Sequence, residues 1–399
     1  MSDIPSRFGN DPQPVGPLGI IAMDGCKSLG EKVNSYLVKW EKEPENADQV
    51  LLTYPGYLRS NFLLDADCPR FSSGEGKAVI RQSVRGYDLY ILCDVTNYSN
   101  TYRMYGMDVP MSPDDYFQDL KRIIAAEGKK AKRVSVIMPY LYEGRQHRRA
   151  ARESLDCAMA LQELTAMGID NIITFDAHDP RVQNAIPRSG FENVHPTYQM
   201  LKALLRKLPD LKIDRDHMMC ISPDEGAANR NIYYATMLGL DMGLFYKRRD
   251  YSVVVNGRNP IVAHEYMGES VEGKDVLIAD DILATGDSML DLARELKRRK
   301  CGRIFMATTF AMFTNGIEVF SQAYKEGLFD YILATNLNYL RPELRQQPWF
   351  IEVDMSKYIA LIIATLNHDR SISPLLNPMQ RIQNLLARHR AAQIESDQK

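Results

Sequence analysis

The sequence lacks a long apolar segment and an apolar N-terminal leader. The longest apolar run near the C-terminus, Tyr358–Leu366, is far shorter than the roughly 20 residues that span a bilayer. The first residues, MSDIPSRFGNDPQPVG, contain no apolar core of the kind found in secretory signal peptides. We therefore expect no membrane partner and interpret residues 1–18 as a flexible lead-in.

The sequence also lacks a strong excess of charge and closely spaced cysteines. Its 49 basic and 51 acidic residues leave a net charge of −2, so we expect no nucleic acid partner and only a local anion site. No CxxC pair indicates zinc, and a chain of 399 residues does not need a disulfide framework. The dispersed cysteines instead predict a reducing, cytoplasmic protein: Cys26, Cys68, Cys93, Cys157, Cys220 and Cys301.

The chain has the composition of an ordinary globular protein, and predicted strands alternate with predicted helices along it. Hydrophobic residues make up 45% and charged residues 25%, which suits two domains with a core each. Apolar runs predict strands at Gly19–Met23, Asp88–Cys93, Arg133–Met138, Asn171–Phe175, Met218–Ile221, Met242–Phe245, Asp275–Ala279 and Ile304–Thr309. Helical patterns lie at Ser28–Lys39, Pro113–Glu127, Arg152–Met167, Glu225–Leu238 and Met289–Arg299. This alternation is typical of doubly wound α/β domains with mainly parallel sheets.

The alternating pattern runs through the chain twice, which predicts two α/β domains. The polar segment Pro187–Thr197 is the best boundary between them. We expect an N-terminal domain over residues 19–190 and a C-terminal domain over residues 191–376. The remaining residues, 377–399, are charged and helix-prone, and we expect this tail outside the compact fold.

One stretch, DVLIADDILATGDSM, carries the clearest chemical signal. Asp280 and Asp281 follow the predicted strand Asp275–Ala279, and ligands of open α/β sheets bind at the carboxyl ends of strands. The small-residue loop Ala284–Ser288 then opens a helix, an arrangement that aims backbone N–H groups at a phosphate. Carboxylates beside such a loop fit the hydroxyl groups and the phosphate of a sugar phosphate. The alternative is an acidic strand end followed by an ordinary turn.

This stretch resembles the phosphoribosyl-pyrophosphate signature of type I phosphoribosyltransferases. The resemblance implies that Asp280 and Asp281 hold the ribose 2- and 3-hydroxyls. It also implies that the loop holds the 5-phosphate through Ala284, Thr285, Gly286, Asp287 and Ser288. Many members carry Asp-Thr-Gly-Gly-Thr in this loop, so the chain lacks an acidic residue at Ala284 and has an additional one at Asp287.

Further stretches, in family order, resemble the ribose-phosphate pyrophosphokinases. They are RFSSGEGKAVIRQSVRGYDLYIL (70–92), MPYLYEGRQHRR (138–149), ITFDAHDPRVQNAI (173–186), ISPDEGAANR (221–230) and FYKRRD (245–250). The resemblance implies ATP binding between the domains by Phe71, Ser73, Glu75, Arg145 and Gln146. It implies catalytic roles for Lys247, Arg249 and His178, and contacts of His178 and Asp224 with Mg²⁺, directly or through water. The chain departs from the family at Ser73 and His147, where Asp is usual, and at Glu143 and Gly144.

Each of these residues has an ordinary interpretation when it is taken alone. His178 alone would be a structural histidine, Phe71 a core residue, and Lys247–Arg249 a basic surface turn. Their joint order favours the enzyme: Mg²⁺-dependent transfer of the diphosphoryl group of ATP to the C1 hydroxyl of ribose 5-phosphate, giving phosphoribosyl pyrophosphate and AMP. We also predict a mobile closing loop over residues 250–268.

Two other hypotheses stay open. A phosphoribosyltransferase would use the Asp280–Ser288 loop equally well, but would leave Arg70–Glu75, Arg145–Gln146 and Lys247–Arg249 unexplained. A non-catalytic regulatory paralogue that binds nucleotide is consistent with the departures at Ser73 and Ala284. The resemblance further implies a homo-oligomer, a hexamer built from dimers, with Phe71 and Glu75 contributed across a subunit interface.

Overall fold

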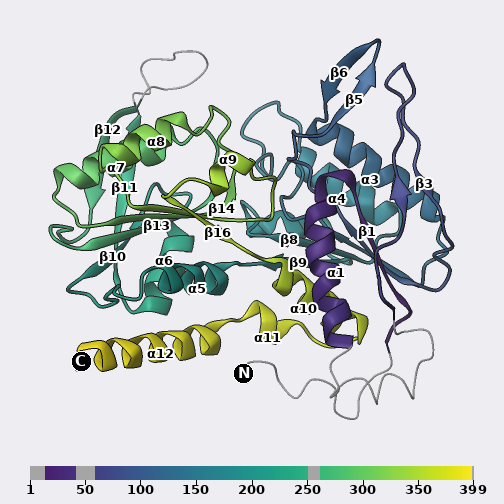
Figure 1. The fold of residues 1–399 in the computed structure, drawn as a ribbon. Helices are drawn as coiled ribbons and strands as arrows, with labels where there is room; N and C mark the ends of the chain where they lie inside the picture. Colours follow the sequence, from purple (N-terminus) through teal and green to yellow (C-terminus); the bar gives the residue numbers. More distant parts are fainter. Residues whose placement is uncertain (1–13, 42–58, 250–260, 398–399) are drawn as a thin grey trace. The chain divides into compact units, whose positions relative to one another are not determined.

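The computed structural model describes residues 14–41, 59–249 and 261–397 (Figure 1). Contacts divide the chain into two compact units. Unit 1 comprises residues up to His195 together with Leu337–Tyr339 and Met355–Leu376, and unit 2 comprises the remainder. Within these described ranges, no helix is both long and apolar enough to cross a bilayer.

Unit 1 is built on a parallel five-stranded sheet in the order β1-β4-β7-β8-β9. The interior strand β4 has every residue buried, as expected for a parallel strand covered on both faces. The strands are β1 (Leu18–Ala22), β4 (Asp88–Leu92), β7 (Arg133–Ile137), β8 (Asn171–Phe175) and β9 (Gly190–Val194).

Helices and two small hairpins complete unit 1. Helix α3 begins with a capping box in which Ser112 and Asp115 bond each other's backbone N–H groups, and it ends at Gly128 in the left-handed region. The helices are α1 (Lys27–Glu41), α3 (Pro113–Glu127), α4 (Asp156–Ala166), α10 (Ser356–Asn367) and α11 (Ser373–Leu376), with short 3₁₀ turns η1 (Asp24–Cys26) and η2 (Pro180–Ala185). The hairpins pair β2 (Ala66–Asp67) with β3 (Val79–Ile80), and β5 (Thr101–Met104) with β6 (Met107–Pro110).

Unit 2 contains a seven-stranded sheet in the order β12-β11-β10-β13-β14-β15-β16. All neighbours are parallel except β11 and β12, which form an antiparallel pair at the edge. The strands are β10 (Met218–Ser222), β11 (Asp241–Arg249), β12 (Ile261–Met267), β13 (Asp275–Leu283), β14 (Ile304–Ala311), β15 (Tyr331–Thr335) and β16 (Phe350–Val353).

Helices cover both faces of the second sheet, with α7 and α8 on one face and α5 and α6 on the other (Figure 1). Apolar side chains of α7 and α8 join the sheet in one core around the buried Trp349. The C-terminal α12 packs against α5 and α6, and Nε2 of His389 lies 2.8 Å from the carbonyl oxygen of Leu211. The helices are α5 (Thr197–Lys207), α6 (Ala228–Leu238), α7 (Asp287–Arg298), α8 (Glu318–Lys325), α9 (Pro342–Arg345) and α12 (Met379–Asp397).

The predicted α/β class with mainly parallel sheets is confirmed, and several boundaries differ from the predictions. The segment Met355–Leu376 belongs to unit 1, because α10 packs on α1, whereas we had placed it in the domain 191–376. The tail 377–399 belongs to unit 2 instead of lying outside the fold. Part of the predicted loop 250–268 is wrong, since Ile261–Met267 forms β12 through pairing with β11; residues 250–260 lie outside the described ranges.

A buried ion pair joins the central strands of the first sheet. The Asp88 carboxylate is fully buried and accepts two hydrogen bonds from the Arg133 guanidinium, both 2.8 Å long. It also accepts hydrogen bonds from the Tyr90 hydroxyl at 3.1 Å and the Asn367 amide at 2.8 Å. Burial and the nearby Asp88 charge raise the pKa of Tyr90 well above its ordinary value. The Asp88 carboxylate therefore accepts hydrogen bonds from three different side chains.

Removing the cation should be costly because a carboxylate would stay buried without its counter-charge. We expect Arg133→Met to lower the free energy of unfolding by about 3–5 kcal/mol, measured by equilibrium urea unfolding. Arg81→Met is the matched control. Its ion pair with Asp67 is exposed, with 54% of the Arg81 side chain accessible, so its loss should cost less than about 1 kcal/mol. Equal effects of the two substitutions would contradict the prediction.

Candidate functional site

Asp280 and Asp281 lie inside β13, where this strand continues beyond its neighbour β10. The register with β10 ends at Ile278, whereas the register with β14 continues to Leu283. We had predicted that the strand stops at Ala279, and this boundary is wrong because pairing with β14 sustains the strand through its polar residues. The carboxylates lie beyond the last residue of β13 that pairs with β10.

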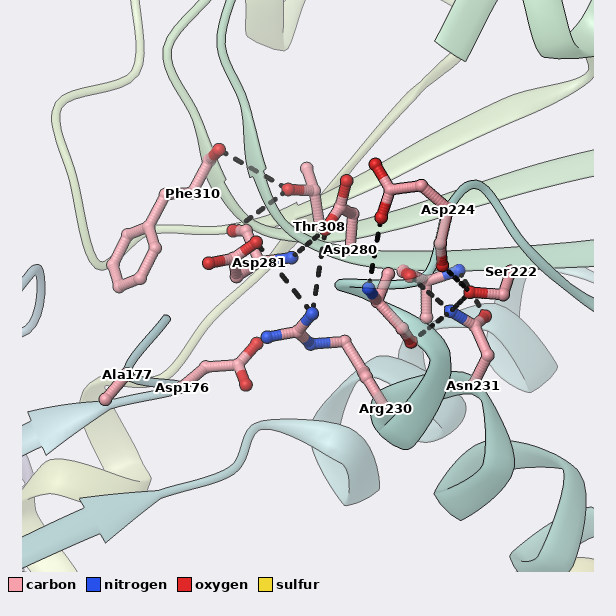
Figure 2. Close-up of polar contacts among 12 residues, drawn as sticks. Asp176, Ala177, Ser222, Asp224, Arg230, Asn231, Asp280, Asp281, Thr308 and Phe310 are labelled. Carbon is pink, nitrogen blue, oxygen red and sulfur yellow. Dashed lines mark hydrogen bonds and ion pairs between the residues drawn. The ribbon is translucent and has the colours of Figure 1, made fainter. Parts of the chain in front are cut away.

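The guanidinium of Arg230, near the start of α6, faces both carboxylates (Figure 2). Its Nη1 lies 3.6 Å from Oδ1 of Asp280 and 3.8 Å from Oδ1 of Asp281. Burial is the largest influence that raises the pKa of Asp280 well above its ordinary value, followed by the charge of Asp281 and a hydrogen bond with it. Arg230 acts in the opposite direction, and Asp224 raises this pKa further. One cation thus partly balances a cluster of carboxylates.

Asp224 lies in the loop between β10 and α6, and local hydrogen bonds hold it. Its Oδ1 accepts a hydrogen bond from the Ala227 N–H at 3.1 Å, and its carbonyl oxygen accepts one from the Ser222 hydroxyl at 2.7 Å. Because Asp224 influences the pKa of Asp280, the structure brings this predicted residue together with the paired carboxylates.

The predicted loop Ala284–Ser288 consists of a three-residue connection after β13, Ala284–Gly286, and the first two residues of α7. Gly286 precedes the helix with φ of 86°, a left-handed conformation that favours glycine. A Cβ at this position would overlap the ring of Phe320. Thr285, Asp287 and Ser288 are exposed and Ala284 is half-buried, so the loop presents backbone N–H groups and hydroxyls at the N-terminus of a helix.

Sequence reasoning missed Arg230 and Asn231, although the former closes the quoted segment ISPDEGAANR. Asn231 is fully buried, and its side-chain amide bonds both the N–H and the carbonyl of Ala279 (Figure 2). The available signal was their position on the helix that follows β10. Their contacts depend on the order of strands in the sheet, which the sequence does not state.

In unit 1, Phe71, Ser73 and Glu75 lie together on an exposed turn before β3. The Phe71 N–H donates to the Glu75 carbonyl at 2.7 Å, and the Ser73 hydroxyl donates to the Glu75 carboxylate at 2.8 Å. The Phe71 ring is 54% exposed, so it is available for stacking and is not a core residue. Arg70 anchors the turn through two hydrogen bonds to the buried carboxylate of Asp119, at 2.5 and 2.8 Å.

Arg145 and Gln146 lie on a second loop of unit 1, between β7 and α4. The Gln146 amide donates to the Ser154 carbonyl at 2.8 Å, and its N–H donates to the Glu143 carbonyl at 2.8 Å. Glu143 has φ of 54°. Burial raises the pKa of Glu143, and the exposed Arg145 acts to lower it.

His178 follows β8 and is exposed. Its ring centroid lies 5.5 Å from that of His147. Nε2 of His147 lies 3.4 Å from Oδ2 of Asp179. The Arg181 guanidinium donates to Asp179, and this hydrogen bond is the main cause that lowers the pKa of Asp179 to about 2. The unusual His147 therefore lies beside the predicted His178.

Lys247 and Arg249 lie on β11, with backbone partners His264 and Ile261 on β12. Their side chains lie outside the described residues. Their backbone pairs with β12 at the edge of the sheet and directly precedes the predicted loop 250–268. Their catalytic roles stay predictions.

The described part of the chain contains no cluster of three or more His, Cys, Asp or Glu residues arranged to hold a metal ion. Mg²⁺ usually keeps several waters and binds one or two carboxylates together with substrate phosphates. Asp224, beside Asp280 and Asp281, supplies oxygen donors of this kind, so the donor set fits a hydrated Mg²⁺. The nitrogen of His178 fits better through an intervening water.

Two mainly parallel α/β units, one of them with paired carboxylates on the central strand of its sheet and a small-residue loop after that strand, define a phosphoribosyltransferase-like protein. Residues 18–168 match the model of the N-terminal domain of ribose phosphate pyrophosphokinase, and residues 191–325 match that of the phosphoribosyl transferase domain. The chain belongs to the ribose-phosphate pyrophosphokinase family.

Individual relatives agree with this assignment. The ribose-phosphate pyrophosphokinase of Vibrio parahaemolyticus is 27% identical over 319 residues, covering 78% of this chain and 91% of the relative. That of Chromobacterium violaceum is 28% identical over 320 residues, covering 78% and 87%. The crystal structure of phosphoribosylpyrophosphate synthetase from Mycobacterium smegmatis has the same fold, with a TM-score of 0.68 and 17% identity, covering 88% of this chain and 99% of that chain.

The raised pKa of Asp280 predicts a pH-dependent stability. Because the folded chain holds this proton above the ordinary pKa of 3.8, the contribution is fully present below that pH and is lost as pH rises through the folded pKa. Asp281→Asn should make this loss smaller, since it removes a charge that raises the pKa. Arg230→Gln should make the loss larger.

The measurement is the free energy of unfolding in urea, determined between pH 4 and pH 8 for each variant. Asp291→Asn, an exposed acid on α7, is the control and should leave the pH dependence unchanged. Shifts of the same sign for Asp281→Asn and Arg230→Gln would show that the charges of the cluster do not act as described.

Proposed function

We propose that this chain transfers the diphosphoryl group of ATP to the C1 hydroxyl of ribose 5-phosphate in an Mg²⁺-dependent reaction. Synthesis of phosphoribosyl pyrophosphate follows from the family. ATP as donor, the metal and the residues that act are the proposed part. The observation that carries the proposal is the paired carboxylates followed directly by the loop Ala284–Ser288, within a chain that matches both family models in order.

The ribose site is assigned to the open edge of β13. Asp280 and Asp281 would accept hydrogen bonds from the 2- and 3-hydroxyls, and the N–H groups and hydroxyls of the loop would hold the 5-phosphate. Arg230 keeps the two carboxylates in place at 3.6 and 3.8 Å. Such an arrangement orients the C1 hydroxyl without a covalent bond to the protein.

ATP recognition is assigned to unit 1 and charge stabilisation to β11. The exposed Phe71 ring would stack on the adenine, with Ser73 and Glu75 beside it, and Arg145 and Gln146 would contact the nucleotide from their loop. Lys247 would stabilise the charge that develops on the β-phosphoryl group, and Arg249 would hold the transferred group. Phosphoryl transfer depends mainly on positioning and on such charge stabilisation.

In the proposed reaction the C1 oxygen attacks the β-phosphorus in line and releases its proton to solvent. The bond from this phosphorus to the oxygen that bridges it to the α-phosphorus breaks, and AMP leaves. Mg²⁺ would neutralise phosphate charge during this step. Asp224 would hold it through oxygen, and His178 would contact it through water.

The proposal also covers the cellular environment and the assembly state of the protein. All six cysteines are free thiols, five of them buried, which supports a reducing, cytoplasmic environment. Assembly into a homo-oligomer, a hexamer built from dimers, stays a prediction that size measurement of the purified protein would test.

The decisive assay supplies ATP, ribose 5-phosphate and Mg²⁺ and follows AMP and phosphoribosyl pyrophosphate together. We expect equal amounts of both products, formed only when the sugar is present. Lys247→Ala should lower kcat at least about 100-fold, because it removes charge stabilisation of about 3 kcal/mol from the transition state, while ATP still binds.

Lys300→Ala is the matched control, since Lys300 is an exposed lysine paired with Glu272, and it should keep full activity. Near-full turnover by Lys247→Ala would refute the role of that residue alone. Absence of both products with the wild-type chain would refute the enzyme and favour the regulatory paralogue that binds nucleotide.

Asp287 places a negative charge beside the proposed phosphate site, at the first residue of α7. We expect Asp287→Asn to lower the KM for ribose 5-phosphate about two- to fivefold, because repulsion of the phosphate decreases. The gain should shrink with added salt, since the site is exposed. Asp291→Asn, one turn further along the helix, should leave KM unchanged. A higher KM for Asp287→Asn would show that this carboxylate assists binding.

A further inference from the structure

Asn231 is a fully buried polar residue whose hydrogen bonds all lead to backbone or to the β10 end. Its Nδ2 donates to the carbonyl of Ala227 at 2.9 Å and to that of Ala279 at 2.8 Å. Its Oδ1 accepts from the Ala279 N–H at 3.0 Å. Nδ2 also lies 3.5 Å from the hydroxyl of Ser222. The amide therefore connects the loop after β10, helix α6 and strand β13.

The Ala279 bonds fall at the point where β13 loses its neighbour. The β10–β13 register ends with Ile221 opposite Ile278. Ala279 is the following residue, and its N–H and carbonyl are groups that a longer β10 would have bonded. The Asn231 amide supplies one donor and one acceptor in their place, much as a further β10 residue would.

The residues on either side of this contact are those of the proposed ribose site. Asp280 follows Ala279 directly, and Arg230 precedes Asn231 and contacts both carboxylates. The start of α6 thus holds β13 twice, by charge at the side chains and by hydrogen bonds at the backbone (Figure 2). A shift of the peptide between Ala279 and Asp280 would move both carboxylates relative to the phosphate loop.

We propose that Asn231 is a positioning residue for ribose 5-phosphate, acting through Ala279 on Asp280 and Asp281. The proposal rests on the proposed function and adds to it a residue that touches neither substrate. Its side chain takes the place of a further β10 residue and fixes the position of the paired carboxylates relative to the sugar hydroxyls.

The test is the split between two Michaelis constants in Asn231→Ala. Loss of the amide leaves two buried backbone groups of Ala279 without partners, so the strand should relax locally. We expect the KM for ribose 5-phosphate to rise about tenfold, while the KM for ATP stays within about twofold of wild type. A uniform loss of folded protein would lower kcat without changing either constant.

The matched control is Asn367→Ala in unit 1. Asn367 is equally buried, and its amide donates to the Gly16 carbonyl at 3.2 Å and to Asp88 at 2.8 Å. Its loss should lower the melting temperature and leave both Michaelis constants unchanged. If Asn231→Ala is not recovered in folded form, Asn231→Ser, which keeps one hydroxyl donor, should show a smaller rise of the same selectivity.

The outcomes distinguish the positioning role of Asn231 from the proposed reaction. A folded Asn231 variant with lower melting temperature and an unchanged KM for ribose 5-phosphate would overturn the positioning role and leave the proposed reaction intact. Equal increases in both constants would also overturn it. Absence of turnover in the wild-type chain would instead refute the proposed reaction, and the role of Asn231 with it.

Discussion

A difference in length between two neighbouring strands shapes the site in unit 2. Strand β10 ends at Ser222, whereas β13 continues to Leu283 and keeps its pairing with β14. One edge of β13 is therefore open beside the paired carboxylates, and the other edge remains held. The carboxylates thus lie on a strand that is held along one edge, which gives their side chains precise positions. The open edge beside the loop after β10 gives a ligand access to them.

The same arrangement keeps like charges close together. Asp280 and Asp281 are adjacent, Asp224 adds to their repulsion, and Arg230 offsets only part of it. A ligand that brought hydroxyl donors or a hydrated cation would reduce this repulsion, which the unliganded fold bears. The cost falls on stability, as is common at sites whose geometry serves a ligand.

Local patterns predicted the parts of the fold that depend on local interactions. Strands such as β4 and β14 are fully buried and mostly apolar, and α3 carries its own capping signals. The polar end of β13 was not predicted, because Asp280 and Asp281 interrupt its apolar run. The pairing with β14 that continues the strand cannot be read from the sequence. Helix α10 was assigned to the wrong domain, since its contact with α1 joins residues more than 300 positions apart.

The segment Ala284–Ser288 shows how a departure from a family pattern can conserve charge while moving it. The common pattern Asp-Thr-Gly-Gly-Thr has its carboxylate at the position of Ala284, and this chain has one at Asp287 instead. The net charge of the loop, and hence its long-range field, is the same in both arrangements. At Asp287 the carboxylate lies in the first turn of α7, where interaction with the helix dipole contributes about 0.3–1 kcal/mol. The carboxylate of Asp287 therefore stabilises α7, but it also makes the local electrostatic potential less favourable for a bound anion. One side chain has both effects.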